Sequence, residues 1–295
     1  MSSLWNTLAN AISEATQTPF TLTSRTVVGG GCINDSYQLR GRDEQSYFVK
    51  LNHAGKLAMF EAEAQGLAEL ERCGAVRVPR VICLGSTAQQ AYLVLEHIPL
   101  IQGDDTQAMA RLGRELAQLH RCTHTHFGWH SDNTIGATPQ HNAQSSCWID
   151  FWRTQRLGFQ LTLATRQGYG ATLQKKGDAL MANLDRFFES YTPAPSLLHG
   201  DLWSGNCAIS KGGVPVIFDP AVYFGDRETD LAMTTLFGRF PATFYQAYEA
   251  CYPLDDGYQQ RQTLYNLYHI LNHLNLFGSG YLNQAQLMLE QLLDY

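Results

Sequence analysis

The apolar positions in the first hundred residues recur mainly at every second residue, which is typical of β-strands. Within residues 46–51, three apolar side chains alternate with Phe48 and Lys50, so the two sets face opposite sides of a sheet. The same pattern, bounded by turn residues, predicts strands at Arg25–Gly31, Asp35–Leu39, Ser46–Leu51, Val78–Leu84 and Ala91–Glu96. In this region helical spacing predicts a helix at Leu57–Arg72, and Gly74 stands just past its end.

After Pro99 the spacing of apolar residues becomes mainly helical. It predicts helices at 105–121, 146–165, 171–190, 241–252, 257–277 and 283–293. An irregular stretch, Pro193–Thr229, contains two short strand candidates, at Cys207–Ile209 and Val216–Phe218. A strand-rich part followed by a helical part predicts an α+β fold with two lobes, 1–98 and 99–295, that meet at a cleft near residues 97–104.

Composition and charge narrow the classes of function. Of the 295 residues, 44% are hydrophobic and 16% are charged, which excludes a disordered chain. Acidic residues (27) outnumber basic ones (21) and no basic cluster occurs, so we expect no nucleic-acid partner. No apolar run approaches the roughly 18 residues of a membrane helix, so we expect no membrane partner. Seven cysteines without regular spacing, and a beginning unlike a signal peptide, predict a cytoplasmic protein with reduced thiols.

The residues with the clearest candidate chemistry are Asp201, Asn206 and Asp219 in the irregular stretch. A carboxylate such as Asp201 can accept the proton of an attacking hydroxyl group in phosphoryl transfer. Asn206 and Asp219 can offer oxygen ligands to Mg²⁺, which neutralises the charge of the γ-phosphoryl group of ATP. Asp and Asn are also ordinary turn formers. The three residues together, beside predicted strands, favour catalysis.

The first lobe contains residues that could hold ATP. Gly29–Gly31 follows a strand and could offer backbone N–H groups to a phosphate, although three glycines are also typical of a tight hairpin. Lys50 lies within a strand, and Glu63 on the next helix can approach it to orient the ammonium toward phosphates. The alternative is that both are solvated surface charges. A G-x-x-x-x-G-K-[ST] loop is absent, because the sequence contains no Gly-Lys-Ser or Gly-Lys-Thr. The glycine triplet also does not match G-x-G-x-x-G, since Asn34 stands where the last glycine belongs.

These motifs resemble those of the fructosamine (ketosamine) kinase family, within the protein-kinase-like group that includes aminoglycoside phosphotransferases and choline kinases. The resemblance runs from about Gly29 to Gly278. It rests on the segments Gly30–Asn34, Met59–Glu63, His199–Asn206, Asp219–Ala221 and Tyr223–Asp230. It implies a two-lobed protein-kinase-like fold, with an antiparallel sheet and one main helix in the N-terminal lobe and a mostly helical C-terminal lobe.

The resemblance also implies a reaction, which is transfer of the γ-phosphoryl group of ATP to the 3-hydroxyl of a ketosamine, with Mg²⁺ as cofactor. Ketosamines are sugars joined by glycation to free amines or protein lysines. Because the phosphorylated adduct then falls apart, the activity would be protein deglycation. Carried over by position, Asp201 is the proton acceptor, Asn206 and Asp219 bind Mg²⁺, and Lys50 with Glu63 orients the phosphates.

The remaining expected site residues follow from the same resemblance. The nucleotide would be bound by Gly30, Gly31 and Cys32 of the glycine loop and by backbone groups of Glu96, His97 and Ile98 beside the adenine. Trp203 and His199 are candidate substrate contacts; for Trp203 the alternative is packing between the loop and a helix. Asp230 is expected to support the catalytic loop.

Several alternatives stay open at the level of sequence. The chain could be a kinase for another amino-bearing alcohol, such as an aminoglycoside or choline, or a nucleotide-binding pseudokinase. Cys32 could be a redox-sensitive thiol, so both a monomer and a thiol-linked dimer are compatible with the sequence. The histidines and cysteine within 120–130 could bind zinc, although their spacing does not match a closed site. Asp226 stands where the family often has histidine, which could alter substrate choice.

Overall fold

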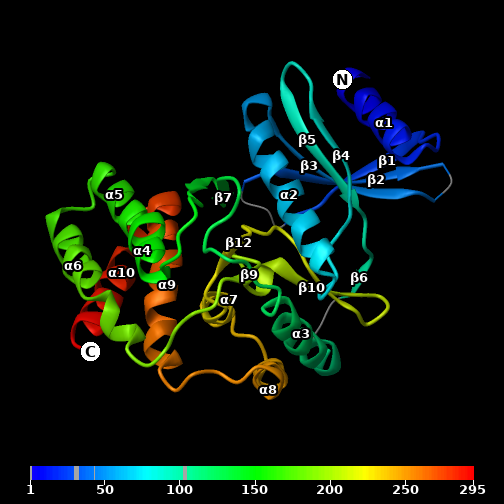
Figure 1. The fold of residues 1–295 in the computed structure, drawn as a ribbon. Helices are drawn as coiled ribbons and strands as arrows, with labels where there is room; N and C mark the ends of the chain where they lie inside the picture. Colours follow the sequence, from blue (N-terminus) through cyan, green and yellow to red (C-terminus); the bar gives the residue numbers. More distant parts are fainter. Residues whose placement is uncertain (1, 30–32, 43, 102–104) are drawn as a thin grey trace. The chain divides into compact units, whose positions relative to one another are not determined.

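The computed structural model of the protein describes residues 2–29, 33–42, 44–101 and 105–295 (Figure 1). The chain divides into two compact units. The first comprises Met1–Gly103 and Ala208–Asp219, and the second comprises Asp104–Cys207 and Pro220–Tyr295. This division differs from the predicted boundary after residue 98, because a segment from the irregular stretch packs with the first unit.

The first unit is built on a five-stranded sheet. Its strands are β1 (Leu22–Val27), β2 (Asp35–Gly41), β3 (Ser46–His53), β4 (Val81–Ser86) and β5 (Gln90–Glu96). They are arranged in the order β1-β2-β3-β5-β4, and every neighbouring pair is antiparallel. Each predicted strand is present, with ends shifted by a few residues. The helices of this unit are α1 (Ser2–Thr16) and α2 (Leu57–Cys73) (Figure 1). A 3₁₀ turn at Ala54–Lys56 precedes α2.

The α1 helix covers the face of the sheet to which Val49 and Leu51 point. Leu8 and Ile12 of α1 have no exposed surface and pack in one cluster with these residues and Phe20. Burial of one such side chain stabilises the fold by about 1.5–3 kcal/mol relative to exposure. Sequence reasoning missed this helix, although its apolar residues recur at helical spacing.

The α2 helix lies on the opposite face of the sheet, where Lys50 of β3 contacts Glu63 of α2. The helix ends as the sequence predicted. Gly74 adopts a left-handed backbone (φ +68°) and donates its N–H to the carbonyl of Leu70 at 3.2 Å.

A three-stranded sheet explains why residues 208–219 belong to the first unit. It has the order β11-β10-β6, formed by β6 (Leu100–Ile101), β10 (Cys207–Ser210) and β11 (Pro215–Ile217). In addition, the N–H of Ile217 donates to the carbonyl of Arg77 at 3.0 Å. These backbone contacts hold the segment that leads into Asp219 next to the first hundred residues of the chain.

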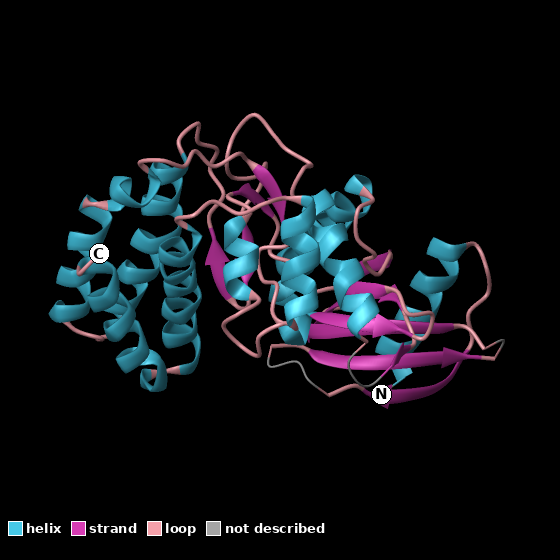
Figure 2. Ribbon diagram, turned by 90° about the horizontal axis from the view of Figure 1, so that it is seen from below, coloured by secondary structure: helices cyan, strands magenta, loops and turns pink. Residues whose placement is uncertain are grey.

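The second unit is mostly helical in its described residues (Figures 1 and 2). Its α-helices are α3 (Thr106–Leu119), α4 (Trp148–Phe151), α5 (Phe159–Arg166), α6 (Ala171–Ala182), α7 (Glu228–Met233), α8 (Ala242–Cys251), α9 (Tyr258–Phe277) and α10 (Leu282–Leu293). A π-helical segment, Trp152–Gly158, joins α4 to α5, and 3₁₀ helices occupy Leu184–Phe188, Ser204–Asn206 and Ser279–Tyr281. None of the helices in the described residues has both the length and the apolar character of a membrane span.

Two short antiparallel strand pairs lie within this helical unit. β7 (Asn133–Ile135) pairs with β8 (Thr138–Gln140), and β9 (Ser196–Leu198) pairs with β12 (Tyr223–Gly225). Neither pair was predicted, because strands of three residues leave no recognisable periodicity. The predicted helices are otherwise present, although the helix expected at 171–190 ends at Ala182 and continues as a 3₁₀ turn.

Close packing of α3 against α8 depends on Gly113. A Cβ atom built on Gly113 would lie 2.2 Å from the carbonyl oxygen of Phe244 and 3.1 Å from the backbone nitrogen of Tyr248. Both contacts are with backbone, so the two helices would have to separate to admit a methyl group.

We therefore expect Gly113→Ala to lower the free energy of unfolding by about 1–3 kcal/mol, the usual cost of overpacking. Urea denaturation measures this directly. The matched control is Gly280→Ala, where a Cβ atom meets nothing within 4 Å, and its effect should stay within about 0.5 kcal/mol. Equal unfolding midpoints for the two variants would contradict this account of the α3–α8 contact.

Candidate active site

Lys50, Glu63 and Asp219 meet in the first unit. The Nζ atom of Lys50 lies 2.5 Å from Oε1 of Glu63 and 2.5 Å from Oδ1 of Asp219. The side chains of Lys50 and Glu63 are 5% and 11% exposed, whereas that of Asp219 is 46% exposed. The predicted approach of Glu63 to Lys50 is therefore present, and neither residue is a solvated surface charge. Contact of Asp219 with the same ammonium was not predicted.

The electrostatics of this triad favour the charged form of Lys50. Burial alone would lower the pKa of Lys50, but the attraction of Asp219 and Glu63 outweighs burial and raises that pKa above its ordinary value. Burial raises the pKa of Glu63, against the opposing attraction of Lys50. A lysine ammonium has three N–H donors and two are engaged here, so one remains for an anionic oxygen.

The backbone of Asp219 is unusual for a residue with a side chain. Its φ angle is +58°, in the left-handed region that Asp adopts more readily than most residues but that still costs free energy. The preceding strand, β11, is held by the contact of Ile217 with Arg77. The strained turn therefore occurs at a supported position, and its carboxylate reaches Lys50.

The other residues expected to hold the nucleotide are only partly described. Gly30, Gly31 and Cys32 lie outside the described residues. On one side of them, the N–H of Val28 donates to the carbonyl of Ser36 at 2.9 Å; on the other, Nδ2 of Asn52 donates to the carbonyl of Ile33 at 3.1 Å. The loop is thus flanked by fixed backbone.

The segment Glu96–Ile98 differs in one respect from expectation. The N–H of Glu96 already donates to the carbonyl of Arg80 at 2.8 Å, so this donor is not available to adenine. The Glu96 carboxylate pairs with Arg77 at 2.5 Å and with Arg80 at 3.4 Å, and these partners keep its pKa low against the effect of burial. The predicted backbone contacts to adenine would then be the carbonyl of Glu96 and the backbone groups of His97 and Ile98.

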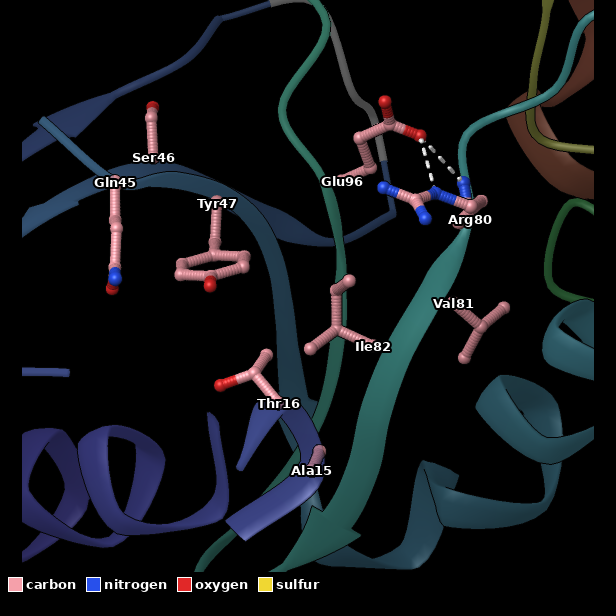
Figure 3. A pocket seen from close by; sticks show the side chains of 9 residues that line it. All are labelled: Ala15, Thr16, Gln45, Ser46, Tyr47, Arg80, Val81, Ile82 and Glu96. Carbon is pink, nitrogen blue, oxygen red and sulfur yellow. Dashed lines mark hydrogen bonds and ion pairs between the residues drawn. The ribbon is translucent and has the colours of Figure 1, made fainter. Parts of the chain in front are cut away.

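A pocket of about 420 Å³ lies beside the end of α1 (Figure 3). It is lined by Ala15, Thr16, Gln45, Ser46, Tyr47, Arg80, Val81, Ile82 and Glu96. Tyr47 packs against the cluster under α1, and it alternates with Lys50 along β3. This pocket therefore opens on the opposite face of the sheet from Lys50 and is not part of the site.

In the second unit, Asp201 and Asn206 lie next to each other as predicted. Nδ2 of Asn206 donates to the backbone carbonyl of Asp201 at 2.9 Å and to its Oδ2 at 3.2 Å. The 3₁₀ turn Ser204–Asn206 brings the amide back toward the carboxylate. Because the nitrogen of the amide faces Asp201, its oxygen points away and can act as a ligand.

The loop that carries Asp201 requires glycine at position 200. Gly200 has a φ of +83°, and a Cβ atom there would lie 2.0 Å from the carbonyl oxygen of Ala221. The N–H of Ala221 also donates to the carbonyl of His199 at 2.8 Å. The segment at Ala221 thus packs directly on the two residues before Asp201.

Asp230, at the start of α7, supports this loop from the other side. Its two oxygens accept the N–H groups of His199 and Gly200, each at 2.8 Å, which confirms the expected support. Burial would raise the pKa of Asp230, but the hydrogen bonds from His120 and from the backbone N–H of Gly200 contribute to lowering it. A buried ionised carboxylate therefore holds the loop.

His120 belongs to this support and not to a zinc site. Its Nε2 lies 3.2 Å from Oδ2 of Asp230 and its Nδ1 lies 2.8 Å from the hydroxyl of Tyr248. Burial lowers the pKa of His120, so the neutral ring donates to Asp230 and accepts from Tyr248. No group of three or more His, Cys, Asp or Glu side chains suited to a metal ion occurs within 2–29, 33–42, 44–101 and 105–295, and the zinc hypothesis for 120–130 finds no support.

The two candidate substrate contacts have different surroundings. His199 has no exposed surface, and its Nδ1 accepts the N–H of Asp201 at 3.2 Å. It therefore shapes the loop and has no access to a substrate in this structure. Trp203 is partly exposed. Its ring lies edge-on to Phe237, with centroids 6.2 Å apart, and would clash with any Cβ atom on Gly205.

Asp226 is a structural residue. It is completely buried and accepts hydrogen bonds from the hydroxyls of Tyr265 at 2.5 Å and Tyr191 at 2.9 Å. The expectation that it could alter substrate choice is not supported, because it has no exposed surface.

The cysteines also require a correction. Cys73 and Cys122 are disulfide-bonded, whereas Cys83, Cys147, Cys207 and Cys251 are free. The expectation that all thiols are reduced is therefore wrong for two of the six described cysteines. Cys32, the proposed redox-sensitive thiol, lies outside the described residues.

The candidate metal ligands fit Mg²⁺ by their chemistry. Asn206 directs its amide oxygen away from Asp201, and Asp219 has a half-exposed carboxylate with one oxygen on Lys50. Both offer hard oxygen donors, which Mg²⁺ prefers over nitrogen and sulfur. Glu63 and Asp219 together carry more charge than the ammonium between them, which also favours a bound cation.

Comparison with known proteins assigns the chain to a family. The model of the fructosamine kinase family matches residues 4–295. A probable ketoamine kinase from Synechocystis is 51% identical over 290 residues, covering 98% of this chain and 97% of the relative. The protein-ribulosamine 3-kinase of Arabidopsis thaliana is 44% identical over 271 residues, covering 90% and 81%. The crystal structure of a candidate fructosamine-3-kinase from Haemophilus somnus superposes with a TM-score of 0.89 at 28% identity, covering 98% and 97%. The chain therefore belongs to the fructosamine kinase family.

Proposed function

We propose that the protein is an ATP-dependent kinase that phosphorylates the 3-hydroxyl group of ketosamines, and that it thereby removes sugars from glycated amines. Within a chain of this family, the observation that carries the proposal is the buried Lys50 held between Glu63 and Asp219. A lysine fixed by two carboxylates, with one N–H donor left over, is suited to a triphosphate.

Asp201 is the proton acceptor of the proposed reaction. It accepts the proton of the sugar hydroxyl as the oxygen attacks the γ-phosphorus, and the bond to the β-phosphate oxygen breaks, which releases ADP. Asn206 orients the carboxylate by donating to its Oδ2. Asp230 and Gly200 keep the backbone of the loop in place.

The nucleotide would be positioned by the first unit. Lys50 would bind phosphate oxygens while Glu63 and Asp219 keep its ammonium in place. Asp219 and Asn206 would hold Mg²⁺, which supplies neutralisation of the phosphate charge when it is bound. The carbonyl of Glu96 and the backbone of His97 and Ile98 would bind the adenine.

The substrate class is inferred from the relatives, which are named as a ketoamine kinase and a ribulosamine 3-kinase. Both free ketosamines and glycated protein lysines are compatible with the proposal. The proposed compartment is the cytoplasm, where ATP is supplied. Kinases for aminoglycosides and choline share the fold at 14–16% identity, which supports the fold but not their substrates.

Replacement of Lys50 tests the role of the triad. Lys50→Met should lower kcat/KM for ATP by about 10²–10³-fold, the usual cost of removing one group that stabilises developing charge. Steady-state kinetics with a ketosamine at saturation measures the loss. The matched control is Lys211→Met at an exposed position, which should remain within about twofold of the wild type. A Lys50→Met enzyme with nearly normal kinetics would contradict the assignment.

Replacement of Asp201 tests the proton acceptor. Asp201→Asn keeps an acceptor for the amide of Asn206 but cannot take a proton, so we expect kcat to fall by about 10²–10⁴-fold while ATP binding is retained. Calorimetry measures the binding and a coupled assay measures turnover. Asp178→Asn, on the exposed side of α6, controls for loss of a surface carboxylate. Normal turnover by Asp201→Asn would rule out the proposed mechanism.

A substrate comparison decides between the proposed function and its alternatives. ATP consumption and the mass gain of the acceptor should be measured with fructosamine, ribulosamine and erythrulosamine adducts, and in parallel with choline and an aminoglycoside. We expect phosphorylation of at least one ketosamine. Phosphorylation of choline or the aminoglycoside alone would favour the other kinase classes, and ATP binding without turnover would favour a pseudokinase.

A further inference from the structure

The hairpin β7–β8 and the turn after it carry buried amide side chains that the proposed mechanism does not use. Asn133, Gln140 and Asn142 are 8%, 1% and 1% exposed. An amide buried without partners costs free energy, commonly about 1–3 kcal/mol in proteins. Three of them in one place therefore require an explanation in the contacts that they make.

These amides form one directional network. Gln140 donates from Nε2 to Oδ1 of Asn133 at 2.8 Å and to the carbonyl of Ala221 at 3.0 Å, and its Oε1 accepts the hydroxyl of Tyr268 at 2.8 Å. Asn133 in turn donates from Nδ2 to the carbonyl of Val222 at 2.7 Å. Because each donor faces an acceptor, only one orientation of each amide satisfies the whole set.

Arg156 fixes the orientation of the third amide. Its Nη2 donates to Oδ1 of Asn142 at 2.8 Å, and Nδ2 of Asn142 then donates to Oδ1 of Asn133 at 3.1 Å. Arg156 has no exposed surface and lies in the π-helical segment Trp152–Gly158. In the described part of the chain it has no carboxylate partner; instead the rings of Phe151 and Tyr223 lie 4.6 and 4.1 Å from its guanidinium carbon. A buried cation is costly, but a guanidinium can only donate, so it allows Asn142 a single orientation.

The network ends on the backbone that packs against the catalytic loop. Gln140 fixes the carbonyl of Ala221, which is the atom that a Cβ on Gly200 would approach to 2.0 Å. The N–H of the same residue donates to His199. A displacement of Ala221 would therefore be transmitted to the residues immediately before Asp201.

We propose that Gln140 is a positioning residue for the catalytic loop: by holding Ala221, it fixes the backbone at His199 and Gly200 from which Asp201 extends. The proposal rests on the proposed function, because it takes Asp201 to be the proton acceptor. It does not depend on which ketosamine is the substrate.

The test compares two buried glutamines of the same unit. Gln140→Met removes the donors to Ala221 and Asn133. Gln160→Met removes an equally buried amide whose partners are Asn272, Asn275 and the oxygen of Tyr268, but it leaves the donation of the Tyr268 hydroxyl to Gln140 in place. Both variants should lose similar thermal stability. We expect only Gln140→Met to lower kcat, by about 10–100-fold, because a misplaced catalytic group has an effect of this size. Its KM values for ATP and for the ketosamine should stay within about threefold of those of the wild type.

Hydrogen exchange provides a second readout that needs no turnover. In Gln140→Met, amides of the peptide spanning residues 198–203 should exchange faster than in the wild type, whereas Gln160→Met should leave them unchanged. Faster exchange in Gln140→Met alone would support the positioning role, whether or not the wild type phosphorylates a ketosamine. Failure of the wild type to phosphorylate any ketosamine would refute the proposed function instead. Equal exchange and equal kcat in the two variants would overturn the proposal.

A milder variant covers the case in which Gln140→Met does not fold. Tyr268→Phe removes only the hydroxyl that orients Gln140. It should lower kcat by about two- to tenfold, the equivalent of one neutral hydrogen bond, and should speed exchange in the same peptide. Wild-type kcat and exchange in Tyr268→Phe would count against the network as a positioning device.

Discussion

The ammonium of Lys50 between two carboxylates is the interaction on which the candidate site depends. It is placed by a strand whose alternate residues pack under α1, so that Lys50 must face α2 and Glu63. It also ties Asp219, a residue of the irregular stretch Pro193–Thr229, to the sheet of the first unit. A buried ammonium is stable only when carboxylates pair with it, so removal of any one of the three residues would destabilise the positions of the other two.

In the second unit, the loop that carries Asp201 has little regular secondary structure and is held in place by hydrogen bonds. The backbone N–H groups of His199 and Gly200 are satisfied by the buried Asp230. Ala221 supports the same loop from the opposite direction, and the hairpin amides support Ala221. The catalytic carboxylate can thus project from an irregular segment and still have a defined position, because buried polar groups replace secondary structure.

Much of the site could be predicted from the residues alone. Lys50 and Glu63 were expected to approach each other from the alternation of one strand and the spacing of one helix, and Asn206 was expected beside Asp201 from their separation. The supporting residues were harder to find. His120 could be seen only as one of several histidines. Gln140 left no signal, since two of its three partners lie 81 and 128 residues away in the chain.

The sequence by itself determined the five strands of the main sheet, most of the longer helices, their order and the family, because periodicity, turn residues and short motifs are local properties. Tertiary structure decided which buried polar groups support the loop, that Asp226 is enclosed by tyrosines, and that residues 208–219 pack with the first unit. These outcomes depend on hydrogen bonds between distant segments. Such bonds are required because burial removes water from polar groups, and no local pattern specifies which partner replaces it.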